Sequence, residues 1–351
     1  MMKINFYTTV DEVVPFPEKE AFYLITEDIE FRSLPSSKNE RVGAVVPHVI
    51  ANNTLYETGV LQVLFDEEKK VKFHFLNMKD EIACSFQDNS SLILLLDALT
   101  PTFEPFIEKL GMAIDANNSV FGSGVGSRSF TPEKVIFYKD DIFAEHALIV
   151  EVLEKMSIGV QHGWNPLFGP IVVTKANGTC IQEINHEKAF EFYAKMLKDL
   201  ANKEIREDNF FEVAKAFPLG ILSYADSEFT VRDPLGISED GGLNLVNSIA
   251  ENETVYIMQG EAQSLIDSAR ENASMTMRNK NSATNLLFDC ISRVLYMEDD
   301  FQKELQAISE ASAHAEFYGI TSIGEITNKG ANKLNIYNKT NLIGVVNHES
   351  I

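Results

Sequence analysis

The amino-acid sequence predicts an α+β protein, with two packed domains in which mixed, largely antiparallel sheets are covered by helices. Its 351 residues, 45% of them hydrophobic, are enough to bury two cores. Short runs rich in β-branched and aromatic residues recur between polar turns along the whole chain, as is typical of strands. A few longer segments carry apolar residues at helical spacing, and these predict the covering helices.

The first half is predicted to consist mainly of strands. They are expected at residues 3–7, 21–26, 42–46, 56–65 and 71–76, and again at 135–138, 147–153, 157–161 and 171–174. Residues 90–114 instead predict helix, in two short pieces or a kinked pair because Pro101 and Pro105 interrupt it. Its apolar positions would form one face packed on the sheet, and they are Leu92, Leu95, Leu96 and Leu99.

A hairpin turn at Gly178 and a long amphipathic helix mark the middle of the chain. We expect Asn185 to cap this helix. The apolar face of the helix consists of Ala189, Phe192, Tyr193, Met196, Leu197 and Leu200. Because strand-rich sequence lies on both sides, the domain boundary is placed just before the helix, which gives domains of residues 1–184 and 185–351.

The second half also combines short predicted strands with amphipathic helices. Strands are predicted at residues 220–224, 229–232, 243–249, 254–258, 285–292, 316–326 and 333–346. Two more helices are predicted, one with Ala262, Leu265, Ile266, Ala269 and Ala273 on its apolar face and one built on Phe301, Leu305 and Ile308.

Composition argues against several classes of partner. The formal net charge of −22 disfavours nucleic acid and anionic membrane surfaces, because binding to both depends on clustered Lys and Arg. The longest apolar run, residues 92–96, is far too short to cross a bilayer, and the N-terminus lacks the features of a signal peptide. Cys84, Cys180 and Cys290 fit neither a disulfide framework nor a CxxC metal site. We therefore expect a cytoplasmic protein with no membrane insertion.

Two motifs suggest binding but also have structural explanations. The glycine-rich segment 120–128 matches neither a Walker loop nor GxGxxG, so we expect a structural turn beside a pocket. The seven histidines show no HExxH pair and no zinc spacing, so no dedicated metal site is expected. His162 and Trp164 could stand together on a cavity wall. Alternatively, Trp164 fills the core between the domains and His162 bonds to backbone.

Catalysis has less support, since no GxSxG elbow is present and Cys290 follows an apolar run that is typical of an inert core thiol. An enzyme with an unrecognised active site stays an alternative. Asp289, Arg293 and Glu325 lie near predicted strand ends, and either pair with one another or bind a small zwitterion. We expect Arg293, Glu325 and Asn338 to converge near one cleft.

Four segments of the chain resemble one family. They are GITSIGEI at residues 319–326, LLFDCISR at 286–293, LNIYNKT at 334–340 and HGWNPLFGPIVVTKA at 162–176. Together they resemble FIST domains, a family of sensory and signal-transduction modules. The resemblance is strong over residues 120–346 and weaker before them, where residues 42–47 replace the small glycine turn that is expected early in the family.

The resemblance implies a sensory protein that binds a small ligand, with amino acids as candidates, and needs no cofactor. The candidate ligand-binding residues are Arg293, Glu325, Asn338, His162 and Trp164. Some members of the family are haem-containing nitric-oxide sensors that regulate histidine kinases, so haem is an alternative. His162 and His314 are available as axial ligands, but there is no CxxCH attachment motif. Since the chain ends at Ile351 without a kinase segment, we expect its signal to pass to a separate protein.

Overall fold

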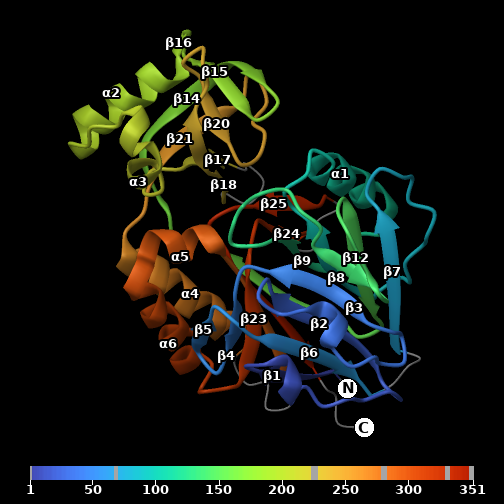
Figure 1. The fold of residues 1–351 in the computed structure, drawn as a ribbon. Helices are drawn as coiled ribbons and strands as arrows, with labels where there is room; N and C mark the ends of the chain where they lie inside the picture. Colours follow the sequence, from blue (N-terminus) through green and yellow to red (C-terminus); the bar gives the residue numbers. More distant parts are fainter. Residues whose placement is uncertain (1, 67–69, 223–227, 278–282, 329–332, 348–351) are drawn as a thin grey trace.

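The computed structural model describes residues 2–66, 70–222, 228–277, 283–328 and 333–347. It confirms the predicted α+β class, because sheets of mixed and mainly antiparallel pairing are combined with covering helices. Three sheets have six strands each and a fourth has eight. The first three sheets form a body, and the fourth forms a lobe at one end of it (Figure 1).

The three sheets of the body have their strands in a common order. The first contains β1 (Met2–Tyr7), β6 (Val60–Phe65), β2 (Glu20–Thr26), β3 (Val42–Val46), β10 (Ile136–Tyr138) and β11 (Asp141–Phe143). The second contains β7 (Val71–Asn77), β12 (His146–Val152), β8 (Ser91–Asp97), β9 (Ser119–Val125), β24 (Glu325–Thr327) and β25 (Asn335–Tyr337). The third contains β13 (Met156–Gln161), β26 (Asn341–Asn347), β22 (Ala283–Cys290), β23 (Phe317–Ser322), β4 (Val49–Ala51) and β5 (Thr54–Tyr56).

This common order is an internal threefold repeat, with repeats of residues 2–65, 71–152 and 156–347. Each sheet has one central parallel pair, and its other neighbouring strands are antiparallel. The hairpin that follows each parallel pair leaves its own sheet and joins another: β4–β5 joins the third, β10–β11 the first and β24–β25 the second. Each sheet is therefore completed by a hairpin from another repeat.

One glycine occupies the same position in each repeat. Gly43, Gly122 and Gly319 lie in the second strand of each parallel pair, opposite Tyr23, Leu94 and Leu287. A Cβ on Gly43 would lie 2.0 Å from the carbonyl oxygen of Tyr23, and one on Gly319 would lie 1.8 Å from that of Leu287. The strands therefore approach more closely there than a side chain allows.

The inner faces of the three sheets share one hydrophobic core. Its members include Phe22 and Leu24 from β2, Ile93 and Leu95 from β8, and Leu286 and Phe288 from β22. Helices cover the outer faces of two of these sheets: α1 (Phe103–Ala113) packs on the second, and α4 (Ala262–Thr276) and α6 (Phe301–Ala311) pack on the third. The short helix α5 (Ile291–Met297) continues directly from β22.

The lobe, residues 165–259, is inserted into the third repeat between β13 and α4. Its sheet contains β14 (Asn165–Asn177), β15 (Cys180–Ile184), β16 (Glu187–Lys188), β17 (Leu219–Leu222), β18 (Phe229–Arg232), β19 (Pro234–Ile237), β20 (Leu243–Leu245) and β21 (Thr254–Gln259). Helices α2 (Ala189–Ala201) and α3 (Phe210–Ala214) pack on this sheet and close a core of the lobe's own. Strand β15 ends at Ile184 and pairs with β16, so residues on both sides of the predicted boundary lie in one sheet. The division of the chain at residue 184 stays a prediction.

The structure corrects several local expectations. Residues 91–97 form strand β8, not a helix, because this strand lies between the central core and α1 and is apolar on both faces. Residues 119–125 form strand β9 in place of a glycine-rich loop. Asn185 lies in the turn between β15 and β16 with φ of 50°, and Lys188 is the residue before α2.

The expected turn at Gly178, the central helix and the two later helices are confirmed. The strand predicted at 285–292 ends at Cys290, where α5 begins. The strand predicted at 316–326 is divided at Gly324, which has φ of 98°.

Candidate functional site

A cavity of about 270 Å³ lies where the lobe meets the body. From the body it is lined by the end of β22, the start of α5, the turn between β23 and β24, and the connection from β25 to β26. From the lobe it is lined by α3, β19 and the segment after β20. The lining residues are Leu99, Phe130, Phe211, Leu235, Val246, Cys290, Ile291, Ser292, Leu295, Ile323, Gly324 and Asn338.

Asn338 is the predicted site residue that lines this cavity. It follows β25 directly and is only 2% exposed. Its Oδ1 atom has no hydrogen-bond partner among the residues that the structure describes. A buried amide oxygen without a partner is costly in a folded protein, so a donor that reached this atom would remove an existing cost.

Glu325 lies directly behind the cavity wall and is fully buried. Its Oε2 atom accepts hydrogen bonds from the Thr340 hydroxyl at 2.6 Å and the Thr340 amide at 3.2 Å. Burial raises the pKa of Glu325 to about 8, although these hydrogen bonds lower it. The side chain is therefore mainly an uncharged carboxylic acid at neutral pH.

Cys290 ends β22 and is a buried free thiol. Burial raises the pKa of this thiol far above its ordinary value, and nearby Glu325 adds to the effect. Since the thiolate is the nucleophilic form, Cys290 has the properties of an inert cavity-wall residue.

Arg293 lies in α5 and is completely buried, and the groups around it occupy its donors. Its guanidinium binds both carboxylate oxygens of Glu304, at 3.1 and 2.7 Å, and lies 3.2 Å from the Asp289 carboxylate. It also donates to three main-chain carbonyls, those of His162 at 2.6 Å, Leu265 at 3.1 Å and Lys339 at 3.2 Å. In this conformation Arg293 orders the cavity wall from behind and does not line the cavity.

Trp164 contacts the same wall at Lys339, and His162 contacts Trp164. The Trp164 indole donates to the Lys339 carbonyl at 3.2 Å, and the His162 Nδ1 atom accepts from the Trp164 amide at 2.9 Å. Trp164 packs against Gly260, where a Cβ would lie 2.1 Å from its ring, and against the ring of Tyr296. Neither His162 nor Trp164 lines the cavity.

The predicted site residues thus converge on the short segment 338–340. Asn338 faces the cavity, Glu325 holds Thr340, and Arg293 and Trp164 both bind the Lys339 carbonyl. Their role in binding a ligand stays a prediction.

Lys339 connects this segment to the lobe, and the sequence analysis did not identify it. Its ammonium group is fully buried, lies 3.2 Å from the Asp233 carboxylate and donates to the Lys215 carbonyl at 3.0 Å. It also lies 4.7 Å from the Trp164 ring centroid, within the range of a cation–π contact. Asp233 and Lys215 belong to the lobe, so this buried ion pair bridges lobe and body.

A second polar contact joins lobe and body through α1. The Glu104 carboxylate accepts from the Asn247 amide group and from the Ser248 main-chain amide, each at 3.0 Å. Arg232 of the lobe donates to the Ile336 carbonyl at 2.9 Å, and burial lowers the pKa of Arg232 to about 10. Several separate polar contacts therefore hold the lobe to the body.

Comparison of the three repeats reveals polar residues found only in the third. Strand register places Glu325 where the other repeats have Val49 and Ile136. It also places the hydrogen-bonded pair of Asp289 and Asn341 where the others have Ile25 with Val60 and Leu96 with Ala147. Because the same fold forms twice without these polar groups, they are not required by the fold itself.

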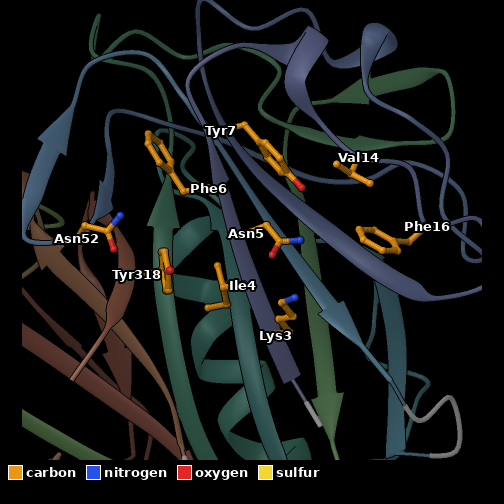
Figure 2. Close-up of a pocket in the computed structure, with 9 residues that line it drawn as sticks. All are labelled: Lys3, Ile4, Asn5, Phe6, Tyr7, Val14, Phe16, Asn52 and Tyr318. Carbon is orange, nitrogen blue, oxygen red and sulfur yellow. The ribbon is translucent and has the colours of Figure 1, made fainter.

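A second, more open depression runs along β1 (Figure 2). Its lining residues are Lys3, Ile4, Asn5, Phe6, Tyr7, Val14, Phe16, Asn52 and Tyr318, with a volume of about 390 Å³. Asn5 and Tyr7 both donate to the buried Gln62 at 3.2 Å, so these polar groups already have a partner within the protein. None of the predicted site residues lies there.

The residues around the lobe–body cavity do not fit haem. Cys290 is the lining residue with an axial ligand atom, and its raised thiol pKa opposes the thiolate form that haem iron binds. His162 and His314 do not line the cavity. Across the described residues, His, Cys, Asp and Glu form no group of three or more that could hold a metal ion.

The described helices include none that is both long enough and apolar enough to span a membrane. The structure combines an α+β body with an inserted lobe, and a mainly apolar cavity lies between them. Residues 38–187 match the FIST N domain model and residues 189–328 match the FIST C domain model. The chain belongs to the FIST family, whose domains act in sensing and signal transduction. No curated protein matches the chain significantly.

Proposed function

We propose that this protein is a cytoplasmic sensor that encloses a small molecule between its lobe and body and signals through a separate protein, such as a histidine kinase. The observation that supports this most is the position of Asn338. Asn338 lines the cavity and has a buried Oδ1 without a partner among the described residues, and the next residue, Lys339, forms the buried ion pair to the lobe.

The connection between Asn338 and Lys339 provides a route from ligand to signal. A ligand that contacts Asn338 favours one position of segment 338–340. The buried ion pair of Lys339 and Asp233 couples that position to the lobe. Because the cavity is lined from both lobe and body, the ligand binds most strongly to one relative placement of the two. The population of that placement is the signal that a partner protein reads.

Within this proposal the predicted site residues have two roles. Asn338 contacts the ligand, while Glu325, Arg293, His162 and Trp164 hold segment 338–340 in position. Direct contact between Arg293 and an amino-acid ligand requires the guanidinium to leave Glu304. The Arg293 substitution described in the Discussion tests this alternative.

A thermal-shift screen of small metabolites tests the proposed function. A compound bound by the folded state raises the melting temperature. Leu235→Trp places a large ring at the cavity rim, where Leu235 is 50% exposed, and should abolish the shift produced by any true ligand. Leu200→Trp is the matched control, because Leu200 is 48% exposed and does not line the cavity.

The proposal is wrong if every compound that stabilises the wild type also stabilises Leu235→Trp equally well. A Soret band after haem addition that persists in purified protein would instead favour the haem alternative.

A further inference from the structure

We propose that the ligand of the lobe–body cavity is an uncharged molecule with an apolar body and an N–H or O–H donor that binds Asn338 Oδ1. This inference rests on the proposed function and narrows it to one chemical class of ligand. It differs from the amino-acid ligand that the sequence suggests, because a zwitterion needs a cationic and an anionic partner.

The wall of the cavity has no charged side chain. Eight of its lining residues are apolar, and they are Leu99, Phe130, Phe211, Leu235, Val246, Ile291, Leu295 and Ile323. The other four are Cys290, Ser292, Gly324 and Asn338, all uncharged. Such a wall favours an apolar ligand and disfavours a charged one, which would lose its hydration without gaining a counter-ion.

The charged groups behind the wall already have partners or are uncharged. Arg293 is bound by Glu304 and by three carbonyls, and Lys339 by Asp233. Glu325 has a pKa of about 8 because of burial, so near neutral pH it offers a ligand ammonium group little negative charge. A zwitterion would have to break one of these buried ion pairs to obtain a counter-ion.

Asn338 provides a polar feature that selects among uncharged ligands. Its Oδ1 is a hydrogen-bond acceptor with no partner among the described residues, so a ligand donor removes an existing cost. The repeats show that the fold does not require this amide. The residues directly after β5 and β11, at the equivalent place in the first two repeats, are Glu57 and Ala144.

Three probes test the inference by calorimetry on the full chain: indole, benzofuran and L-tryptophan. Indole and benzofuran have nearly the same shape, but only indole carries an N–H donor. We expect the wild type to bind indole about tenfold more tightly than benzofuran, and to bind L-tryptophan more weakly than indole.

Asn338→Ala removes the acceptor and should bind indole and benzofuran with equal affinity. The variant is expected to fold, because Ala144 occupies the equivalent position in the second repeat. The measured quantity is the ratio of the indole affinity to the benzofuran affinity. A general loss of packing in the enlarged cavity weakens the binding of both probes alike and leaves this ratio unchanged. Ser292→Ala, at another polar lining position, is the control and should keep the wild-type ratio.

Three results would overturn the inference. They are tighter binding of L-tryptophan than of indole, a tenfold preference for indole that survives in Asn338→Ala, and no binding of either uncharged probe. The Leu235→Trp variant separates these results from failure of the proposed function. If a charged library compound binds and Leu235→Trp abolishes its binding, the cavity is a ligand site and only the chemical class is wrong.

Discussion

Burial sets the chemical state of the individual residues around the cavity. Glu325 and Cys290 would be charged or reactive in water over part of the physiological pH range, but their buried positions favour the protonated forms. Asn338, which cannot ionise, lines the cavity and keeps a buried acceptor without a partner among the described residues. The residues nearest to the cavity therefore offer hydrogen bonds and apolar surface, and little charge.

The raised pKa of Glu325 makes stability depend on pH. Because its pKa is about 8 in the folded protein and near 4.5 when solvated, the native state holds an extra proton between these values. The free energy of unfolding should fall by up to about 1.4 kcal/mol per pH unit across this window. Its contribution is complete below pH 4.5 and is lost as pH rises to about 8.

Glu325→Gln should remove this contribution, as measured by urea unfolding at a series of pH values. The quantity compared is the difference in unfolding free energy between wild type and variant at each pH. The titration of other groups contributes equally to both proteins and cancels. A difference that stays constant from pH 5 to pH 8 would show that Glu325 ionises normally in the folded state.

Cys290 should react slowly with alkylating reagents in the native protein, because burial limits access and suppresses the thiolate. Cys180, which is partly exposed, provides an internal comparison and should be labelled first. Mass spectrometry after timed alkylation measures both rates. Rapid labelling of Cys290 with loss of ligand binding would instead identify a reactive thiol at the cavity.

Among the secondary-structure elements, the spacing of apolar residues correctly predicts the helices but not strand β8. Helices α2, α4 and α6 each bury one face, so their apolar residues recur at helical spacing. Strand β8 is buried on both faces, between the central core and α1, so no alternation remains to distinguish it from a helix. The pair of Arg293 and Glu304 joins helix α5 to α6.

Arg293→Ala should lower the free energy of unfolding by about 3–5 kcal/mol, because it leaves the Glu304 carboxylate buried without its partner. Arg270→Ala is the matched control, since Arg270 also pairs with a glutamate from α6 but at a surface site 45% exposed. That control should cost less than about 1 kcal/mol. Urea unfolding measures both.

The same Arg293 variant tests the predicted ligand contact. If Arg293 binds an amino-acid-like ligand directly, Arg293→Ala should weaken binding by roughly ten- to a hundredfold while stability changes little. A large stability loss with unchanged affinity in the remaining folded protein would assign Arg293 to the framework.

On the scale of the whole molecule, the lobe is an insertion held at a defined place on a threefold body (Figure 1). Among the polar contacts that maintain that place are the Lys339 ion pair with Asp233 and the bonds of Glu104 to residues 247–248. The cavity lies between lobe and body, so its shape depends on both contacts.

Lys339→Met should destabilise the protein by about 3–5 kcal/mol, because Asp233 is then a buried charge without its ammonium partner. Adding Asp233→Asn should recover part of this loss, and the non-additivity in urea unfolding measures the coupling. Lys303→Met, at an ion pair whose lysine is 67% exposed, is the surface control. Strict additivity of the Lys339 and Asp233 substitutions would show that the pair does not join lobe and body energetically.

Local pattern alone predicted the α+β class, the FIST resemblance, most strands and the amphipathic helices, because each depends on residues close together in the chain. It also named Arg293, Glu325 and Asn338 as candidate site residues, and their role in binding a ligand stays a prediction. Tertiary structure alone decided that hairpins are exchanged among three sheets, since β4 pairs with β23 across more than half of the chain. Pairing over such a distance leaves no signal in local hydrophobic periodicity.

Only the tertiary structure decided which polar residue faces the cavity. Arg293, Glu325 and Asn338 look equally available in sequence, yet the first is enclosed by Glu304 and three carbonyls and the second lies behind the wall. Asn338 alone of the three reaches the cavity, whose other walls come from segments as distant as Leu99 and Phe211. The sequence by itself determined the chemistry available to this protein, and three-dimensional packing decided which of those groups lines the cavity, because only packing brings distant segments of the chain together.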